Sequence, residues 1–241
     1  MKGIITRISQ LDSATEMRMY ALFATQFDGV AIEPFLRDLS QKNWVLLIHD
    51  EAGDLVCFSS ILVFDIRVAN TDYFFVYSGD TVVDRKTWGN SAISYYWMGA
   101  ADWLRRLYKK DRIYWFLMVS GYRTYRFLPV YSEVFFPRFD MPTPDDIQAV
   151  MHAVATERFA DQYNPATGIV RLAVPAILRE GYSGIPENRM NDPHIAFFAR
   201  HNPGHLRGDE LVCFSALSDE TMTRLGKRMW RKGQLLFPDM P

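Results

Sequence analysis

Residues 82–93, with the sequence VVDRKTWGNSAI, combine the residue types and the spacing that suit an anion-binding site. Val82 and Val83 end a strand-like run, a short loop with Gly89 follows, and a helical pattern begins at Ser91. Backbone N–H groups at the start of a helix have no intrahelical acceptor, and the helix dipole adds positive potential there. The segment therefore predicts a site for a phosphate or a similar anion.

The candidate anion-binding residues are those of the loop and of its two flanks. Gly89 would let a phosphate approach the main chain closely, and Arg85 and Lys86 would add positive charge. An ordinary strand-to-helix turn, with Asn90 or Ser91 as the N-cap, explains the same residues without a ligand. The full candidate set is Val82, Val83, Arg85, Lys86, Trp88, Gly89, Asn90 and Ser91.

The elements on either side of this loop show clear patterns. Residues 73–83 are rich in β-branched and aromatic side chains and predict a strand, in which Gly79 marks a bulge or a close backbone approach. Apolar residues at helical spacing predict a long helix over residues 91–109. The uninterrupted apolar run at 113–119 is typical of a strand covered on both faces, and a short helix is expected at 122–128.

The N-terminal part predicts helices followed by a hairpin. Ser13 and Glu16 form a capping-box pattern that would begin a helix over residues 13–27. The other elements expected before residue 73 are a short helix at 32–39 and two hairpin strands at 44–49 and 55–64.

The sequence changes character near residue 140, where two prolines precede a predicted helix at 145–159. Strand-like segments lie at 133–139, 194–199 and 210–217. We therefore divide the chain into a domain over residues 1–140 and a C-terminal α+β extension over residues 141–241.

The two parts contain similar segments, GDLVCFSS at 53–60 and GDELVCFSA at 208–216. This similarity fits a degenerate half-repeat that packs on the first domain. It equally fits the small set of residue types that buried strands share.

Composition excludes several classes of protein. With 241 residues, 49% of them hydrophobic, the chain can bury a core, so disordered and fibrous architectures are excluded. The 27 basic and 28 acidic residues argue against a nucleic-acid binder. The two cysteines, Cys57 and Cys213, lie in apolar runs and suggest a reducing compartment. Neither a signal peptide nor a membrane span is predicted, so we expect a soluble, cytoplasmic protein.

The order of these elements resembles that of the GNAT superfamily of acyl-CoA-dependent acyltransferases over about residues 1–139. The resemblance implies an α/β fold with a mixed central sheet flanked by helices. It also implies that the strand before the anion loop is splayed from its neighbour and that the pantetheine of acyl-CoA pairs with its exposed main chain. A Gln/Arg-x-x-Gly-x-Gly/Ala turn holds the pyrophosphate in that family. Here the corresponding residues are Lys86-x-x-Gly89-x-Ser91, in which Lys86 and Ser91 depart from the family pattern.

The resemblance implies transfer of an acyl group from acetyl-CoA or a longer acyl-CoA to a small-molecule amine. The candidate bases are Asp80 and Glu133, and the candidate acids are Tyr125 and Tyr131. Each also has a structural interpretation, as a hydrogen-bonded or solvated carboxylate or as a buried tyrosine anchored on a carbonyl oxygen. The many aromatic residues would suit a long acyl chain, as in the acyl-amino-acid synthase branch.

No metal is expected, because His194, His201 and His205 show no standard zinc spacing. We expect no nucleic-acid partner, and the sequence leaves a homodimer open. The alternative to an enzyme is a catalytically inactive GNAT-like module that binds acyl-CoA or a partner protein.

Overall fold

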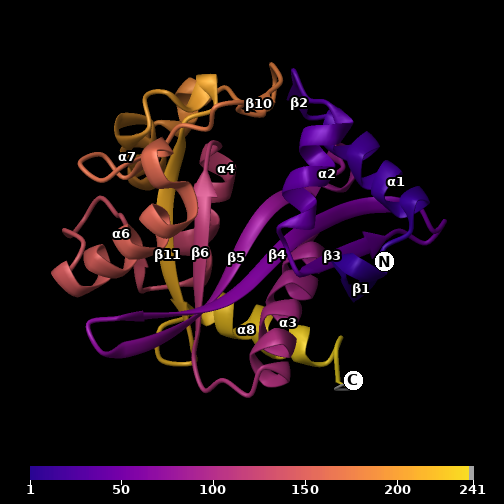
Figure 1. Cartoon of the computed structure of the whole chain (residues 1–241), viewed down its shortest axis with the longest axis horizontal. Helices are drawn as coiled ribbons and strands as arrows, with labels where there is room; N and C mark the ends of the chain where they lie inside the picture. The colour runs from indigo at the N-terminus through magenta and orange to yellow at the C-terminus, as the bar shows by residue number, and fades with distance from the viewer. Residues whose placement is uncertain (239–241) are drawn as a thin grey trace.

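A computed structural model of the protein describes residues 1–238. These residues form a mixed sheet with helices on both faces, so the predicted fold class is confirmed (Figure 1). The strands are β1 (Lys2–Arg7), β2 (Phe27–Asp28), β3 (Trp44–His49), β4 (Leu55–Val68), β5 (Thr71–Val83), β6 (Ile113–Val119), β7 (Phe135–Phe136), β8 (Tyr163–Asn164), β9 (Ile169–Val170), β10 (Ile177–Leu178) and β11 (Glu210–Leu217). The helices are α1 (Ser13–Ala24), α2 (Ile32–Ser40), α3 (Ser91–Leu107), α4 (Tyr122–Tyr125), α5 (Phe127–Tyr131), α6 (Asp145–Phe159), α7 (Pro193–His201) and α8 (Arg224–Gln234).

The main sheet has the strand order β1-β3-β4-β5-β6-β11-β9-β8, and β7 also pairs with β11. Only β5 and β6 run parallel, and the other neighbours are antiparallel. Strand β11 pairs with the whole length of β6, from Ile113 to Val119. Residues on both sides of position 140 therefore belong to one sheet.

A bulge interrupts the pairing of β4 with β5 at the glycine that the sequence singled out. Ser60 of β4 lies opposite two residues of β5, Gly79 and Asp80. A Cβ atom on Gly79 would lie 2.7 Å from the Oγ of Ser60 and 2.8 Å from the Cε of Lys42. Any larger residue here would displace the side chains of Ser60 and Lys42, because both lie directly over the bulge.

Beyond the bulge, β5 and β6 separate. Their parallel pairing ends at Ser78 and Leu117. From there β5 continues beside β4 to Val83, whereas β6 continues beside β11 to Val119. Figure 1 shows β5 turning away from β6 toward α1 and α2. The sheet thus divides into two arms that share the centre of the β5–β6 pair.

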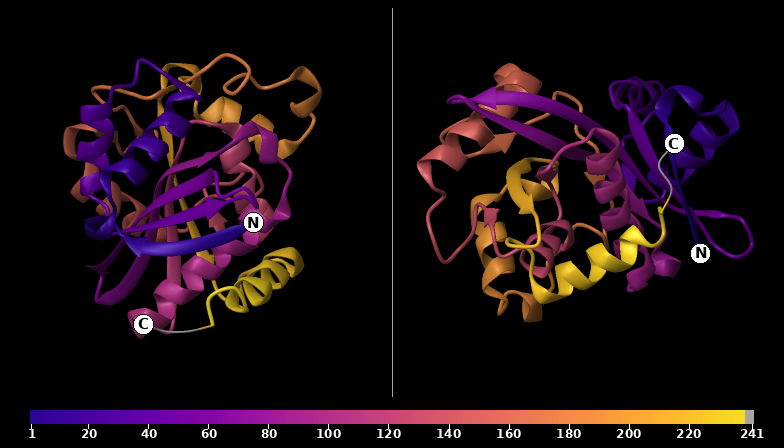
Figure 2. Two further views of the ribbon diagram at one scale, coloured as in Figure 1. Left: turned by 90° about the vertical axis from the view of Figure 1, so that its right-hand side faces the viewer. Right: turned by 90° about the horizontal axis from the view of Figure 1, so that it is seen from below.

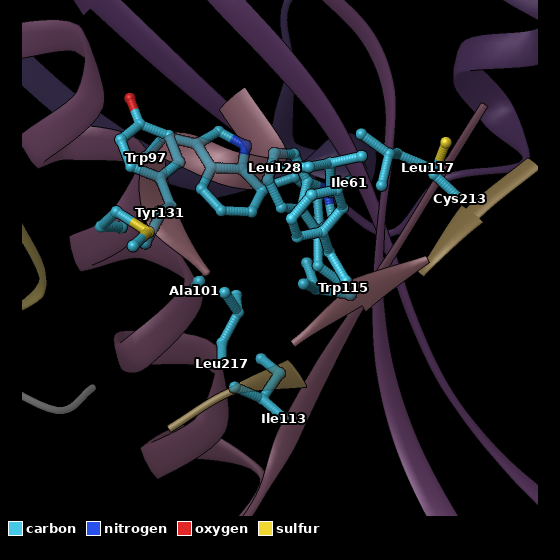
Figure 3. Packing of buried hydrophobic residues seen from close by; sticks show 14 of the residues in the cluster. Ile61, Trp97, Ala101, Ile113, Trp115, Leu117, Leu128, Tyr131, Cys213 and Leu217 are labelled. Atoms are coloured by element: carbon cyan, nitrogen blue, oxygen red, sulfur yellow. The ribbon is translucent and has the colours of Figure 1, made fainter. Parts of the chain in front are cut away.

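One face of the sheet packs against α3, α4, α5, α7 and α8 in a single apolar cluster. Figure 3 shows its centre, where Trp97 of α3 lies beside Trp115 of β6, with ring centroids 4.4 Å apart. The opposite face carries two separate clusters. Phe58 and Val82 pack against α1 and α2, whereas Phe75 and the central part of the sheet pack against α6.

Helix α8 lies along α3 and covers it, as both views in Figure 2 show. The two backbones touch at Gly99 and Gly233. A Cβ atom on Gly233 would lie 2.5 Å from the N of Gly99 and from the O of Tyr95. The close approach of these helices therefore depends on glycine.

A strap formed by residues 171–186 connects the two arms of the sheet. Its strand β10 pairs with β2, where Leu178 lies opposite Phe27. The guanidinium of Arg179 in the strap lies 2.9 Å from Asp28 Oδ1. Figure 1 shows β10 and β2 side by side at the top of the molecule, above the point where β5 and β6 separate.

Three details correct the sequence predictions. Asp12, not Ser13, caps α1, because its carboxylate accepts a 2.7 Å hydrogen bond from the N of Thr15. Residues 194–199 lie in helix α7, not in a strand, since a short apolar run suits either element and Asp192 provides a helix cap. The segment 133–139 contributes only Phe135–Phe136 to the sheet.

The structure also adds strand β1 at the edge of the sheet, which the sequence analysis did not predict. Exposed and half-buried positions alternate only from Lys2 to Ile5, because Thr6 is half-buried as well. This short pattern forms a strand because it pairs with β3 from Lys2 to Arg7.

The packing of α8 on α3 predicts that Gly233→Ala destabilises the fold. The added methyl group would force two backbones apart, and we expect a loss of about 2 to 4 kcal/mol in the free energy of unfolding. Urea denaturation measures this loss. Gly184→Ala is the control, because nothing lies within 4 Å of the added carbon. Equal midpoints for the two variants would contradict the tight contact.

Candidate functional site

The predicted anion loop joins β5 to α3 in a largely exposed turn. Asp84 accepts a 2.9 Å hydrogen bond from the N of Lys86, and Gly89 has φ of 82°. Asn90 caps α3 by accepting a 2.9 Å bond from the N of Ala92. Among the described residues, the amides of Ser91 and Ile93 in the same first turn donate to no protein acceptor. The turn is thus a capped helix start that retains donors for an anion.

Two arginines and two aromatic rings cover this loop. The guanidinium carbons of Arg85 and Arg123 lie 5.8 and 5.0 Å from the centre of the Trp88 ring. Tyr182 of the strap meets Trp88 edge-on, with ring centroids 5.3 Å apart. Arg123 also donates a 2.6 Å hydrogen bond to the carbonyl of Tyr182. The sequence analysis missed Arg123 because no motif connects it with the loop.

Between the bulge and the anion loop, one edge of β5 is not paired with another strand in the described part of the chain. The N of Asp84 donates to the carbonyl of Val56 in β4, 2.8 Å away. By strand alternation, the N–H and C=O groups of Thr81 and Val83 point to the opposite edge, which β6 leaves uncovered. The carbonyl of Val83 accepts hydrogen bonds from Gln26 Nε2 and Trp88 Nε1, at 2.6 and 3.1 Å.

Asp80 and Glu210 both project from the face of the sheet that carries α1, α2 and α6. Asp80 shares this face with Val82 and Glu210 shares it with Val212, because alternate residues of a strand point the same way. Both carboxylates are half-buried and lie between the two apolar clusters of that face. Glu210 comes from β11, far along the chain, and was not among the predicted site residues.

A lysine and a third carboxylate complete this polar group. Lys42 follows α2, is only 4% exposed, and holds its Nζ 2.8 Å from Asp38 Oδ1. Its Nζ also lies 5.5 Å from the centre of the Tyr77 ring. We call the set Asp38, Lys42, Tyr77, Asp80 and Glu210 the acidic centre.

Burial and mutual repulsion favour the protonated forms of the two inner carboxyl groups. Burial and the negative charge of Asp38 raise the pKa of Asp80 from its ordinary 3.8 to about 7, and Lys42 opposes the shift. Burial, Asp80 and Asp38 raise the pKa of Glu210 from 4.5 to about 8. A carboxylate with a pKa near neutrality is suited to take a proton from an ammonium group.

The two candidate tyrosines occupy different surroundings. Tyr125 is fully buried, and its hydroxyl donates a 2.7 Å hydrogen bond to the carbonyl of Pro137. This arrangement matches the structural interpretation of a tyrosine anchored on a backbone carbonyl. Tyr131 instead directs its hydroxyl to the Oγ of Ser94, in the first turn of α3. Burial raises the pKa of Tyr131, which keeps its hydroxyl protonated.

Glu133 lies away from the acidic centre. Its side chain is exposed, and its N donates a 2.7 Å hydrogen bond to the carbonyl of Thr221, beyond the end of β11. Glu210 begins β11, so the strand, about 20 Å long, separates the two glutamates. The structure therefore does not bring Glu133 to Asp80.

The histidines of the segment 194–205 lie in α7 and in the turn that follows it. His194 packs against Phe139 with ring centroids 4.8 Å apart, and His205 Nδ1 lies 2.9 Å from the carbonyl of Asn202. Within residues 1–238, no group of three or more His, Cys, Asp or Glu side chains is arranged to hold a metal ion. Over the same residues, no helix combines the length and the apolar character needed to span a membrane.

No family model and no curated protein matches the chain. Solved structures do match it at low identity. One is a probable N-acyltransferase from Enterococcus faecalis V583, with 18% identity, 56% of this chain and 33% of that chain covered, and a TM-score of 0.39. Another is a GNAT family N-acetyltransferase from Escherichia coli in complex with CoA, with 15% identity, 47% and 62% covered, and a TM-score of 0.35.

A third is glucosamine-6-phosphate N-acetyltransferase from Arabidopsis thaliana, with 14% identity, 61% of this chain and all of that chain covered, and a TM-score of 0.39. The match thus spans a third of the Enterococcus protein and less than two thirds of the Escherichia protein.

The raised pKa values of Asp80 and Glu210 predict a stability that falls as pH rises. Between about pH 4 and pH 8 the folded state retains protons that the unfolded chain releases, so the free energy of unfolding decreases over this window. The double variant Asp80→Asn, Glu210→Gln removes both groups. At about pH 8.5 we expect the free energy of unfolding of this variant to exceed that of the natural protein by about 1 to 3 kcal/mol. At about pH 5 we expect a much smaller difference.

Urea denaturation at the two pH values measures the difference. The natural protein must be compared with the variant, because burial also lowers the pKa of His49 and of His194. These two histidines make stability rise with pH and so oppose the effect of the carboxyl groups. A gain that is the same at both pH values would contradict the raised pKa values.

Proposed function

We propose that this chain is a GNAT-type acyltransferase that moves an acyl group from acyl-CoA to an amine. The observation that carries the proposal is the unpaired edge of β5. It runs from the bulge at Gly79, beside the carboxyl group of Asp80, to the amides that begin α3.

This edge offers acyl-CoA a binding mode that uses the backbone. The amide groups of pantetheine would pair with the main chain of Thr81 and Val83, as an added strand pairs with a sheet edge. The diphosphate would then reach the amides of Ser91 and Ile93, near Arg85. Because Gln26 and Trp88 already occupy the carbonyl of Val83, pairing at that oxygen requires Trp88 to move.

The reaction needs one base and one acid. In the proposed step the amine nitrogen forms a bond to the thioester carbonyl carbon, and Asp80 takes the proton that the ammonium loses. The C–S bond then breaks, and the thiolate leaves with a proton. Tyr131 is our candidate for that proton donor, because its hydroxyl reaches the first turn of α3 through Ser94.

The second candidate function is a module that binds a ligand without turnover. The position of Trp88 favours it, because this ring is held by Val83, Arg123 and Tyr182 across the edge that acyl-CoA would use. Release of free thiol from acyl-CoA in the presence of amines separates an enzyme from a binding module.

The loop predicts that Gly89→Asp weakens binding of acyl-CoA, whereas Gly89→Asn does not. Both side chains tolerate a positive φ, and nothing lies within 4 Å of an added Cβ, so only the charge differs. We expect at least a tenfold difference in the Kd of acetyl-CoA or decanoyl-CoA by calorimetry. Equal affinities would show that the loop is only a turn. Absence of binding to the natural protein would refute the proposed function.

The acidic centre predicts that Asp80→Asn lowers kcat by about 100-fold to 10,000-fold, because the amide cannot accept the proton. The rate of thiol release at saturating amine measures kcat. Glu33→Gln is the matched control, since Glu33 is an exposed carboxylate in the first turn of α2. An Asp80→Asn enzyme with unchanged kcat would exclude Asp80 as the base.

A further inference from the structure

The acidic centre contains more carboxyl groups than a proton acceptor needs. Asp38 is paired with Lys42 at 2.8 Å. Asp80 and Glu210 have no hydrogen-bond or ion-pair partner among the described residues. They come from distant parts of the chain and extend from the same face of the sheet, in the space between α2 and α6. Asp80 and Glu210 therefore lie together near one lysine, Lys42, which is already paired with Asp38.

Two hydroxyl groups in the same place also have no partner. Ser60 is 1% exposed, and its Oγ makes no hydrogen bond. Strand alternation places Ser60 between Phe58 and Leu62, on the face of the acidic centre. Its Oγ and the Cε of Lys42 both crowd the space above Gly79. An unbonded, buried hydroxyl costs free energy unless a ligand satisfies it.

Tyr77 supplies the second hydroxyl. The residue is 8% exposed, and in the described structure its hydroxyl has no hydrogen-bond partner. Its ring meets Phe159 of α6 edge-on, with centroids 6.3 Å apart. The site thus offers carboxylate and hydroxyl acceptors beside an apolar wall.

Lys42 offsets only part of the charge of three carboxyl groups, because it is paired with Asp38 and also acts on Asp80 and Glu210. Arg158 of α6 acts on Tyr77 and not on the two inner carboxyl groups. The guanidinium of Arg158 stacks on Phe64, 4.2 Å from the ring centre, and its Nη2 lies 3.8 Å from Glu157. A ligand that fits this site must bring positive charge and N–H donors.

We propose that the acidic centre binds a short aliphatic diamine, and that such a dication is the acceptor of the acyl group. One ammonium faces Asp80 at the bulge and loses its proton there before it attacks. The other stays charged and is held by Glu210, with the hydroxyls of Tyr77 and Ser60 as further acceptors. The methylene chain lies against the aromatic wall. This inference rests on the proposed function for the role of acceptor, but not for binding of the diamine.

Calorimetry without acyl-CoA tests the binding. The probes are 1,3-diaminopropane, 1,4-diaminobutane and 1,5-diaminopentane. Butylamine, which carries one positive charge, and 4-aminobutanoate, which carries no net charge, are the comparison compounds. We expect the best diamine to bind at least tenfold more tightly than butylamine, and 4-aminobutanoate to bind most weakly. Equal affinities for diamine and butylamine, or no binding of any diamine, would overturn the proposal.

Variants test the assignment of residues. Glu210→Gln should lower the affinity for the diamine at least tenfold and bring it close to the affinity for butylamine. Ser60→Ala should lower it severalfold, and Glu33→Gln on α2 should leave it unchanged. Thermal unfolding checks that each variant is folded. A Glu210→Gln protein that is folded and still prefers the diamine would overturn the proposal.

Proton release provides an independent readout. Because the pKa values of Asp80 and Glu210 are raised to about 7 and about 8, a dication that ionises them should displace protons near neutral pH. Asp38 and Lys42 act on both carboxyl groups, Tyr77 lies beside them, and Arg158 acts on Tyr77, so these groups set this balance. Calorimetry in phosphate and in Tris should therefore give different apparent enthalpies, and identical enthalpies would contradict binding at these carboxylates.

The two proposals can fail separately. If the diamine binds and acyl-CoA does not, the acidic centre is a polyamine site and the acyltransferase assignment is wrong. If acyl-CoA binds and the diamine does not, the acyltransferase assignment stands and the acceptor is of another class.

Discussion

The bulge that places Gly79 and Asp80 opposite Ser60 is the constraint on which the arrangement of the site depends. The added residue bends β5 away from β6, because a bulge increases the local twist of the strand that contains it. It also leaves room above Gly79 for the side chain of Lys42, which a Cβ atom at this position would displace. One backbone irregularity thus separates the two arms of the sheet, exposes an edge of β5 and orients Asp80.

The acidic centre lies on the face of the sheet that α1, α2 and α6 cover with two separate apolar clusters. Helices α1 and α2 bury one arm and α6 buries the other, so polar side chains between them are not displaced by a continuous apolar layer. The opposite face carries one unbroken cluster beneath α3 and its neighbours. The polar group of the acidic centre thus lies on the face whose apolar cover is divided, and not on the face with one continuous cluster.

Many of these elements could be predicted from residue patterns. The hairpin, the strand with a defect at Gly79, the loop with Gly89 and helix α3 follow from local periodicity, turn residues and caps, which act over a few positions. Glu210–Leu217 and Asp145–Phe159 were predicted with the same bounds that the structure has. Local rules were insufficient at 194–199, where a short apolar run forms α7 because Asp192 caps it and its aromatic residues pack against Tyr125.

The sequence by itself determined the strand with a defect at Gly79, the loop with Gly89 and helix α3, because each rests on neighbours in the chain. Only the tertiary structure decided which distant side chains join them. The pairing of β11 with β6 brings Glu210 toward Asp80, and the end of α2 brings Lys42 over the bulge. It also sends Glu133 to the far end of β11 and buries the hydroxyl of Tyr125 on a carbonyl. Register and strand direction set these positions, and neither is encoded in the spacing of residues along one segment.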